Sequence, residues 1–174
     1  MPKLINLENY MSFFIVDVET DGPAPGLYSM VSFAAVKVDE DLKTTFFGKA
    51  KPISEKWIPD ALAISNISRE EHLLYPEPAL AIIEFADWIK NNSKGRPIFL
   101  SDNLAFDWSF MNYYLHAYNE NNPFGFSGRR IGDIYSGLKK DLFAASEWKK
   151  FRVTPHTHNP VDDAIGNAEA FLTI

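Results

Sequence analysis

The sequence predicts a single α/β domain in which helices cover the faces of a mixed sheet. A continuous apolar run over Phe13–Val16 indicates a strand that is buried on both faces. Segments rich in β-forming residues follow this run, and the second half of the chain alternates helical periods with short apolar runs. A length of 174 residues suits one ordinary domain, and a hydrophobic share of 46% is enough to build a core. We therefore expect one domain over 1–174, with its folded core at about 12–173.

The first strands are predicted to form an antiparallel meander. Tyr28–Val38 and Lys43–Lys49 are rich in β-formers and follow the first strand along the chain. Gly22–Gly26 contains two prolines between its glycines, which is typical of a turn or loop.

Two helices with a clear apolar period are predicted in the middle of the chain. Leu80–Asn91 carries apolar residues at positions i, i+3, i+4 and i+7. Leu104–Tyr118 repeats this period, and the residues on its predicted apolar face are Phe106, Phe110, Tyr113 and Ala117. A short apolar run at Pro97–Leu100 predicts a strand between the two helices.

The last third of the chain is predicted to hold a short strand at Arg130–Asp133 and helices at Ile134–Phe143 and Val161–Leu172. Asn159 is suited to cap the last helix, and Pro160 is suited to its first position. Together with the meander, these elements complete a mixed sheet flanked by helices.

Composition excludes several function classes. The chain has no cysteine, which excludes a disulfide scaffold, a cysteine-ligated metal site and a thiol nucleophile. Its formal net charge of -6 argues against a protein that wraps nucleic acid through a general basic surface. Residues 1–10 lack the basic and apolar regions of a signal peptide, and no apolar stretch is long enough to span a membrane. We therefore expect a cytoplasmic protein.

Two acidic residues close the first predicted strand. Asp17 and Glu19 are separated by one residue, so in a strand their side chains point to the same face. Two adjacent carboxylates repel each other, and a divalent cation such as Mg²⁺ or Mn²⁺ relieves that repulsion. Taken alone, the pair is more simply interpreted as a strand end with acids facing solvent.

Two further acidic positions lie where helices begin. Asp107 follows Asn103 in the first turn of the middle helix, and Asp163 follows His158 in the first turn of the last helix. A loop histidine can act as a general base near neutral pH. Each pattern alone is equally typical of acids that stabilise a helix N-terminus.

Together, the three patterns are much more specific. Asp17-Val18-Glu19-Thr20, then Asn-x-x-Phe-Asp ending at Asp107, then His-x(4)-Asp from His158 to Asp163 occur in this order. This resembles the DEDDh (DnaQ-like) 3′–5′ exonuclease superfamily over nearly the whole chain. The stretch from His156 to Ala170 looks still closer to small bacterial and phage 3′–5′ exoribonuclease-like members.

The resemblance implies an RNase H-like fold with a five-stranded mixed sheet. It also implies metal ligation by Asp17, Glu19, Asp107 and Asp163, with His158 as general base. Two Mg²⁺ or Mn²⁺ ions would activate a water and stabilise the leaving oxygen. The His-x(4)-Asp spacing of the superfamily selects Asp163 over its neighbour Asp162 and His158 over His156. The residues alone leave both choices open.

The implied substrate is single-stranded RNA or DNA with a free 3′ end, with RNA somewhat favoured. The residues that adjoin the predicted ligands are candidates for the substrate pocket, and they are Thr20, Leu27, Asn103 and Phe106. Phe106 also lies on the predicted apolar helix face, so core packing is the preferred interpretation for it. A basic segment that includes Lys149, Lys150 and Arg152 could guide the phosphate backbone or be a solvated surface.

Two alternative functions use the same fold. One is a proofreading-type DNA exonuclease subunit that acts with a polymerase, and the other is a non-catalytic nucleic-acid-binding module. The presence of all five motif residues disfavours the module. The chain ends at Ile174, directly after the last helix, so we expect a standalone enzyme, with a homodimer as an open alternative.

Overall fold

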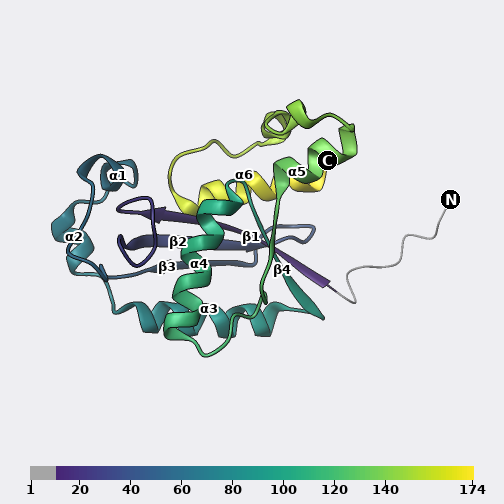
Figure 1. Ribbon diagram of the computed structural model, residues 1–174. Coiled ribbons are helices and arrows are strands. Elements are labelled where there is room, and N and C mark those ends of the chain that lie inside the picture. Colours follow the sequence, from purple (N-terminus) through teal and green to yellow (C-terminus); the bar gives the residue numbers. More distant parts are fainter. Residues whose placement is uncertain (1–10) are drawn as a thin grey trace.

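The computed structural model describes residues 11–174 and contains a five-stranded sheet at its centre (Figure 1). The segment 1–10, for which we expected no signal peptide, lies outside the described residues. The strands lie in the order β3-β2-β1-β4-β5, and β1 pairs antiparallel with β2 but parallel with β4. This arrangement confirms the predicted mixed sheet and its antiparallel meander. The strands are β1 (Met11–Thr20), β2 (Met30–Lys37), β3 (Thr45–Lys49), β4 (Arg96–Ser101) and β5 (Gly128–Arg130).

Helices cover both faces of this sheet. Figure 1 shows α6 along one face and α3 along the other. None of the helices found in residues 11–174 combines the length and apolar character that a membrane span requires. The helices are α1 (Pro59–Ile64), α2 (Arg69–Leu73), α3 (Pro78–Asn92), α4 (Leu104–Tyr118), α5 (Ile131–Lys139) and α6 (Pro160–Thr173), with 3₁₀ turns η2 (Leu142–Ala144) and η3 (Glu147–Phe151).

The alternation of side chains along β1 divides the core into two clusters. Phe14, Val16 and Val18 pack among residues of α3 and α4. Ile15 points to the opposite face, into the cluster that contains residues of α5 and α6. Because side chains alternate along a strand, Asp17 and Glu19 follow Ile15 on the α6 face. The continuous apolar run of β1 therefore reflects burial on both faces, as predicted.

The apolar face of α4 differs from the predicted one. The buried side chains of α4 are Asp107, Phe110, Met111, Tyr114 and Leu115. Tyr113 and Ala117 are exposed instead. The reason is that Asp107 faces the interior at the first turn of α4. Residues one and two turns further along lie on the same face of the helix, so Phe110, Met111, Tyr114 and Leu115 are buried as well.

The region between α4 and α6 was predicted least well. The strand expected at Arg130–Asp133 lies earlier, at Gly128–Arg130, where it pairs with β4. Helix α5 therefore begins at Ile131, before the predicted start, and it ends at Lys139 rather than at Phe143. It stops because Lys140 adopts the left-handed conformation, with φ 55°, and its amide closes the helix end on Gly137.

Candidate active site

The carboxyl end of β1 carries the two acidic side chains predicted to bind metal. Asp17 lies opposite Ala34 and Glu19 lies opposite Ser32 on β2, so only small neighbours flank them across the sheet. A ladder irregularity follows directly, between Glu19 and Thr20. One carboxylate oxygen of each of Asp17, Glu19 and Asp163 lies within 4.8 Å of the others. Strand β1 and helix α6 thus bring three of the four predicted ligands together.

Asp163 reaches this cluster from the first turn of α6. Asn159 accepts a hydrogen bond from the Val161 amide and Pro160 occupies the first turn, which confirms the predicted helix start. Asp163 is fully buried, and its two oxygens accept hydrogen bonds from the amides of Thr157 and His158 at 3.1 and 3.0 Å.

The adjacent carboxylate takes a different direction. Asp162 accepts a hydrogen bond of 2.9 Å from the hydroxyl of Thr157 and lies outside the cluster with Asp17 and Glu19. The helix rotates about 100° per residue, so neighbouring acids cannot face the same site.

Asp107 approaches from the first turn of α4 and is also buried. Burial raises its pKa to about 8, and the negative charge of Asp102 adds to this effect. The charge of Asp107 in turn raises the pKa of Asp17. Asp107 therefore interacts with Asp17 through its charge. It is outside the group of three residues whose carboxylate oxygens lie within 4.8 Å of one another.

Burial and mutual repulsion dominate the electrostatics of the carboxylates at this site, and the positive charge of Arg152 offsets them only in part. Burial raises the pKa of Asp17 well above its usual range, and Asp107, Glu19 and Asp163 raise it further. Burial likewise raises the pKa of Glu19 to about 7, with a contribution from Asp163. A divalent cation would lower the pKa values of Asp17 and Glu19 again. It would coordinate the buried carboxylate oxygens in place of water, and its charge would offset the repulsion between the carboxylates. The donor set thus fits a hard divalent metal ion.

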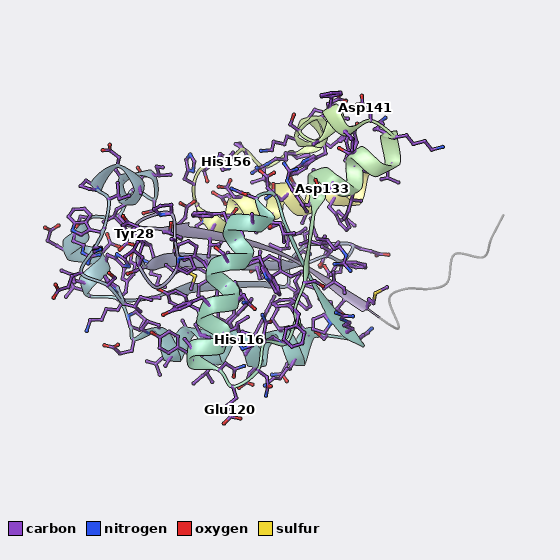
Figure 2. The ribbon with its side chains drawn as sticks, in the orientation of Figure 1. Tyr28, His116, Glu120, Asp133, Asp141 and His156 are labelled. Carbon is purple, nitrogen blue, oxygen red and sulfur yellow. The ribbon has the colours of Figure 1, made fainter. Side chains whose placement is uncertain are left out.

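Two histidines, His156 and His158, border the carboxylates from the loop that leads into α6. Figure 2 labels His156 on this loop. His158 adopts a left-handed backbone conformation, with φ 59°, and its Nδ1 lies 4.0 Å from Glu19 Oε1. His156 instead lies beside Asp163, with its Nδ1 2.8 Å from Asp163 Oδ1. The two imidazole rings are in edge contact, with centroids 4.3 Å apart. Proximity to Glu19 distinguishes His158, whereas His156 contacts the carboxylate of α6.

The basic segment before the histidines is mostly paired with acids. Lys149 contacts Asp102 at 2.6 Å and Lys150 contacts Glu147 at 3.5 Å. Arg152 turns inward, and its Nη2 donates a 3.0 Å hydrogen bond to Asp163 Oδ1. Arg152 also lowers the pKa of Asp17. Guidance of phosphate by the lysines of this segment stays a prediction, whereas Arg152 contacts the carboxylate cluster.

The four candidate pocket residues differ in environment. Thr20 is buried, and its hydroxyl donates to the Gly22 carbonyl at 2.9 Å. Leu27 is 46% exposed on the loop after β1. Asn103 is exposed at the start of α4, where its carbonyl accepts the first helical hydrogen bonds. Phe106 packs against the core, with its ring 5.2 Å from that of Phe110, in agreement with the preferred interpretation.

A buried ionic cluster just beyond Thr20 escaped the sequence analysis. Asp21 accepts hydrogen bonds from the Ser29 amide and from Arg69, the latter at 2.9 Å. His72 is buried beside them, and its Nε2 lies 3.0 Å from the Ala50 carbonyl. The cluster ties the loop after β1 to α2. Asp21 and Arg69 are 48 residues apart in sequence, so spacing gave no signal for the cluster. His116, in contrast, is exposed on α4.

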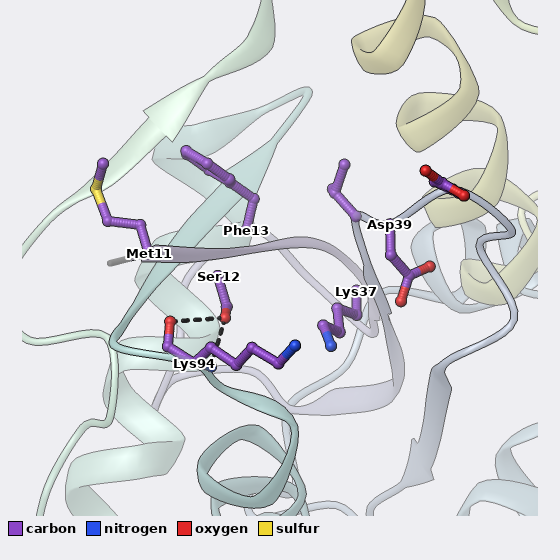
Figure 3. A pocket seen from close by; sticks show the side chains of 8 residues that line it. Met11, Ser12, Phe13, Lys37, Asp39 and Lys94 are labelled. Carbon is purple, nitrogen blue, oxygen red and sulfur yellow. Dashed lines mark hydrogen bonds between the residues drawn. The ribbon is translucent and has the colours of Figure 1, made fainter. Parts of the chain in front are cut away.

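Hollows lie on both sides of the histidines. A cavity of about 350 Å³ runs from His158 to β3 and is lined by Phe47, Lys49 and Tyr75 among others. Another, of about 400 Å³, adjoins His156, Arg152 and Lys149. A third hollow lies at the opposite end of β1, around Ser12 and Lys94, far along the strand from Asp17 (Figure 3).

Comparison with known proteins identifies the family. No protein-family model matches the chain. The 3′–5′ DNA exonuclease Cap18 of Escherichia coli is 40% identical over 171 residues, which cover 93% of this chain and 90% of that protein.

Solved structures share the fold at lower identity. Cell-death related nuclease 4 superposes with a TM-score of 0.72 at 14% identity, over 93% of this chain and 62% of that one. A 3′-exonuclease that recognises a histone mRNA stem-loop gives 0.72 at 16% identity, over 92% and 62% of the two chains. Escherichia coli exonuclease I with a dT13 oligonucleotide gives 0.69 at 18% identity, over 94% and 41%. This chain therefore spans less than two thirds of the length of those structures.

The extent and identity of the match to the Escherichia coli protein exceed what a shared fold alone produces, and the solved structures agree on the fold. Family membership implies the use of a divalent metal, which the carboxylate cluster fits. The chain belongs to the DEDDh (DnaQ-like) superfamily of 3′–5′ exonucleases, has its RNase H-like fold and is an exonuclease.

Proposed function

We propose that this enzyme removes nucleotides one at a time from the 3′ end of single-stranded nucleic acid. The observation that carries the proposal is the approach of Asp17, Glu19 and Asp163 to within 4.8 Å, from a strand and a helix far apart in sequence. The relative from Escherichia coli, which is named a 3′–5′ DNA exonuclease, supports the direction of cleavage.

We assign two divalent ions, Mg²⁺ or Mn²⁺, to Asp17, Glu19, Asp107 and Asp163. When bound, such ions supply positive charge that activates a water and stabilises the departing 3′-oxygen. The carboxylates hold this charge in place, and the raised pKa values of Asp17, Glu19 and Asp107 support the assignment, because a cation would offset the burial and the acidic neighbours that raise them. Arg152 fixes the carboxylate of Asp163 through its hydrogen bond to Oδ1.

We assign His158 as the general base. It would take a proton from the attacking water as the new oxygen–phosphorus bond forms and the bond to the 3′-oxygen breaks. Its place on a loop beside Glu19, half exposed to solvent, supports this role because the base must also release its proton to water. The products are a 5′-mononucleotide and a strand that is one nucleotide shorter.

The cavity between His158 and β3 is our candidate path for the strand. Phe47 is 47% exposed there, and a Phe ring can stack on any base. The Lys49 ammonium lies 4.4 Å from the centre of the Tyr75 ring and 3.7 Å from Glu71 Oε1, and we assign it as the positive charge that meets a phosphate. We propose that Leu27, Thr20 and Asn103 contact the terminal nucleotide, with Phe106 supporting them from the core.

Two expectations differ on whether the enzyme prefers deoxyribose or ribose in its substrate. The name of the Escherichia coli relative supports DNA, whereas the resemblance to exoribonuclease-like members favoured RNA. Matched 5′-labelled DNA and RNA oligonucleotides of identical sequence, incubated with Mg²⁺ or Mn²⁺, measure this preference directly. A ladder shortened from the 3′ end is the expected result with at least one sugar, and no cleavage of either by folded, metal-supplied protein would refute the proposal.

The polymerase-associated alternative stays a prediction with its own test. Activity of the isolated chain on free oligonucleotides supports a standalone enzyme. Activity that appears only after a polymerase is added would support the proofreading alternative.

A further inference from the structure

His156 and His158 form, with Asp163, a second group of metal-binding side chains that overlaps the carboxylate cluster. One ligand atom of each of the three residues lies within 4.8 Å of the others. The side chains of His156 and His158 are 53% and 47% exposed, so both rings are open to ions from solvent. Asp163 is the buried member that fixes the position of the group.

The chemistry of this group differs from that of its neighbour. Asp17, Glu19 and Asp163 offer only carboxylate oxygens, which suit Mg²⁺ and Mn²⁺. Two imidazoles and a carboxylate instead make a donor set typical of Zn²⁺, which takes nitrogen ligands at about 2.0–2.1 Å and oxygen ligands at about 2.0–2.2 Å. Three protein ligands with an open fourth position are common for zinc at functional sites.

We propose that His156, His158 and Asp163 form a Zn²⁺ site that shares Asp163 with the catalytic carboxylates and inhibits the enzyme when it is filled. The inhibitory consequence rests on the proposed function, because it requires that His158 act as the base. A histidine bound to zinc has no free lone pair with which to accept a proton from water. Zinc would also draw on the same Asp163 carboxylate that the catalytic metal needs.

The present contacts of Asp163 permit this arrangement. His156 Nδ1 is 2.8 Å from Asp163 Oδ1, so the two ligand atoms already lie close together. A zinc ion between them, with bonds of about 2.0–2.2 Å to each atom, requires a small separation of the two side chains, and the exposed His156 ring is free to supply it. Arg152 and the amides of Thr157 and His158 continue to hold the Asp163 carboxylate from the protein side.

Zinc binding is measured first without substrate, by calorimetric titration of metal-free protein with ZnCl₂. We expect the wild type to bind a zinc ion that His156→Ala binds at least tenfold more weakly. His116→Ala removes an exposed histidine elsewhere and Asp162→Asn removes the neighbouring acid, and both should bind zinc as the wild type does. Asp17→Asn should also retain the site, since Asp17 belongs to the carboxylate group alone.

A spectroscopic signal and an activity assay complete the test. Co²⁺ in place of Zn²⁺ should give a visible absorption band in the wild type that is lost in His156→Ala. In assays with Mg²⁺, low concentrations of Zn²⁺ should inhibit the wild type and His116→Ala, and His156→Ala should need at least tenfold more Zn²⁺ for half inhibition, relative to its own zinc-free rate.

The two proposals fail in different ways. Equal zinc affinity and stoichiometry in the wild type and a folded His156→Ala would overturn the zinc site, whatever the enzyme cleaves. The same result with His156→Asn would exclude an effect of side-chain loss alone. An enzyme that binds zinc through His156 but shows no Mg²⁺-dependent cleavage would overturn the proposed exonuclease function and leave the zinc site standing.

Discussion

Replacing Arg152 with methionine should destabilise the metal-free protein and strengthen its response to Mg²⁺. Arg152 donates to Asp163 Oδ1 at 3.0 Å, and the two side chains are only 11% and 1% exposed. Methionine keeps the apolar stem but removes the arginine charge from the buried Asp163, which then keeps the amides of Thr157 and His158 and the His156 ring as partners. Removing one member of a buried pair costs about 3–5 kcal/mol. In a domain of this size that lowers Tm by about 6–20 °C.

The same substitution should increase the stabilisation by metal. Arg152 lowers the pKa of Asp17, so it is a positive charge that competes with any cation bound there. Without it, the carboxylates attract Mg²⁺ more strongly, and the rise in Tm on adding Mg²⁺ should be larger than in the wild type.

Thermal unfolding in EDTA and then in excess Mg²⁺ tests both expectations. Lys150→Met is the matched control, because Lys150 and Glu147 form an exposed pair on the same segment. Such pairs contribute about 0–1 kcal/mol, so the control should stay close to the wild type in both conditions. An Arg152→Met variant as stable as the control in EDTA, or one with a smaller Mg²⁺ response than the wild type, would refute the reasoning.

Three further predictions concern the site. The pKa of Glu19 is raised from 4.5 to about 7, so the folded protein binds more protons than the unfolded chain in that interval, and Glu19 alone should contribute a loss of about 3 kcal/mol of stability in the metal-free protein as the pH rises through it, with Asp17 and Asp107 adding losses of the same sign. Urea denaturation across this range checks the sign, and stability that increases with pH would contradict it. His158→Ala should reduce kcat by about 10²–10⁴-fold while the Mg²⁺-induced rise in Tm persists; wild-type turnover would exclude His158 as the base. Phe47→Ala should raise KM by about five- to 100-fold with little change in kcat, as expected for the loss of one stacked base. Leu74→Ala, at another exposed apolar position, is its control, and an equal effect of both would exclude the stacking role.

The parts of the fold that sequence reasoning found are those with strong local signals. Phe13–Val16 lies within a strand buried on both faces because its apolar run is uninterrupted. Helix α6 begins where Asn159 and Pro160 indicate, since capping is decided by neighbouring residues. The helices α1 and α2 were missed because five or six residues are too few to show a helical period.

The candidate site divides in the same way. The motif spacing named Asp17, Glu19 and Asp163, and the structure brings them together. Spacing alone could not predict that Arg152 turns inward, because it follows Lys149 and Lys150, which are exposed, in one basic segment. Its direction depends on Gly166 of α6, where a Cβ would come within 2.7 Å of the Arg152 Nε, so glycine makes the room that the guanidinium fills.

The most direct test of the central claim is the cleavage of a 5′-labelled single-stranded oligonucleotide by the wild type, Asp17→Asn and Asp162→Asn in Mg²⁺. Asp17 lies in the carboxylate cluster, whereas Asp162 hydrogen-bonds to Thr157 outside it, so the two variants remove the same charge from different places. The account predicts a ladder of products shortened from the 3′ end with the wild type and Asp162→Asn, and intact substrate with folded Asp17→Asn. Wild-type cleavage by Asp17→Asn, or release of the 5′ label as a mononucleotide before any shortened product appears, would contradict it.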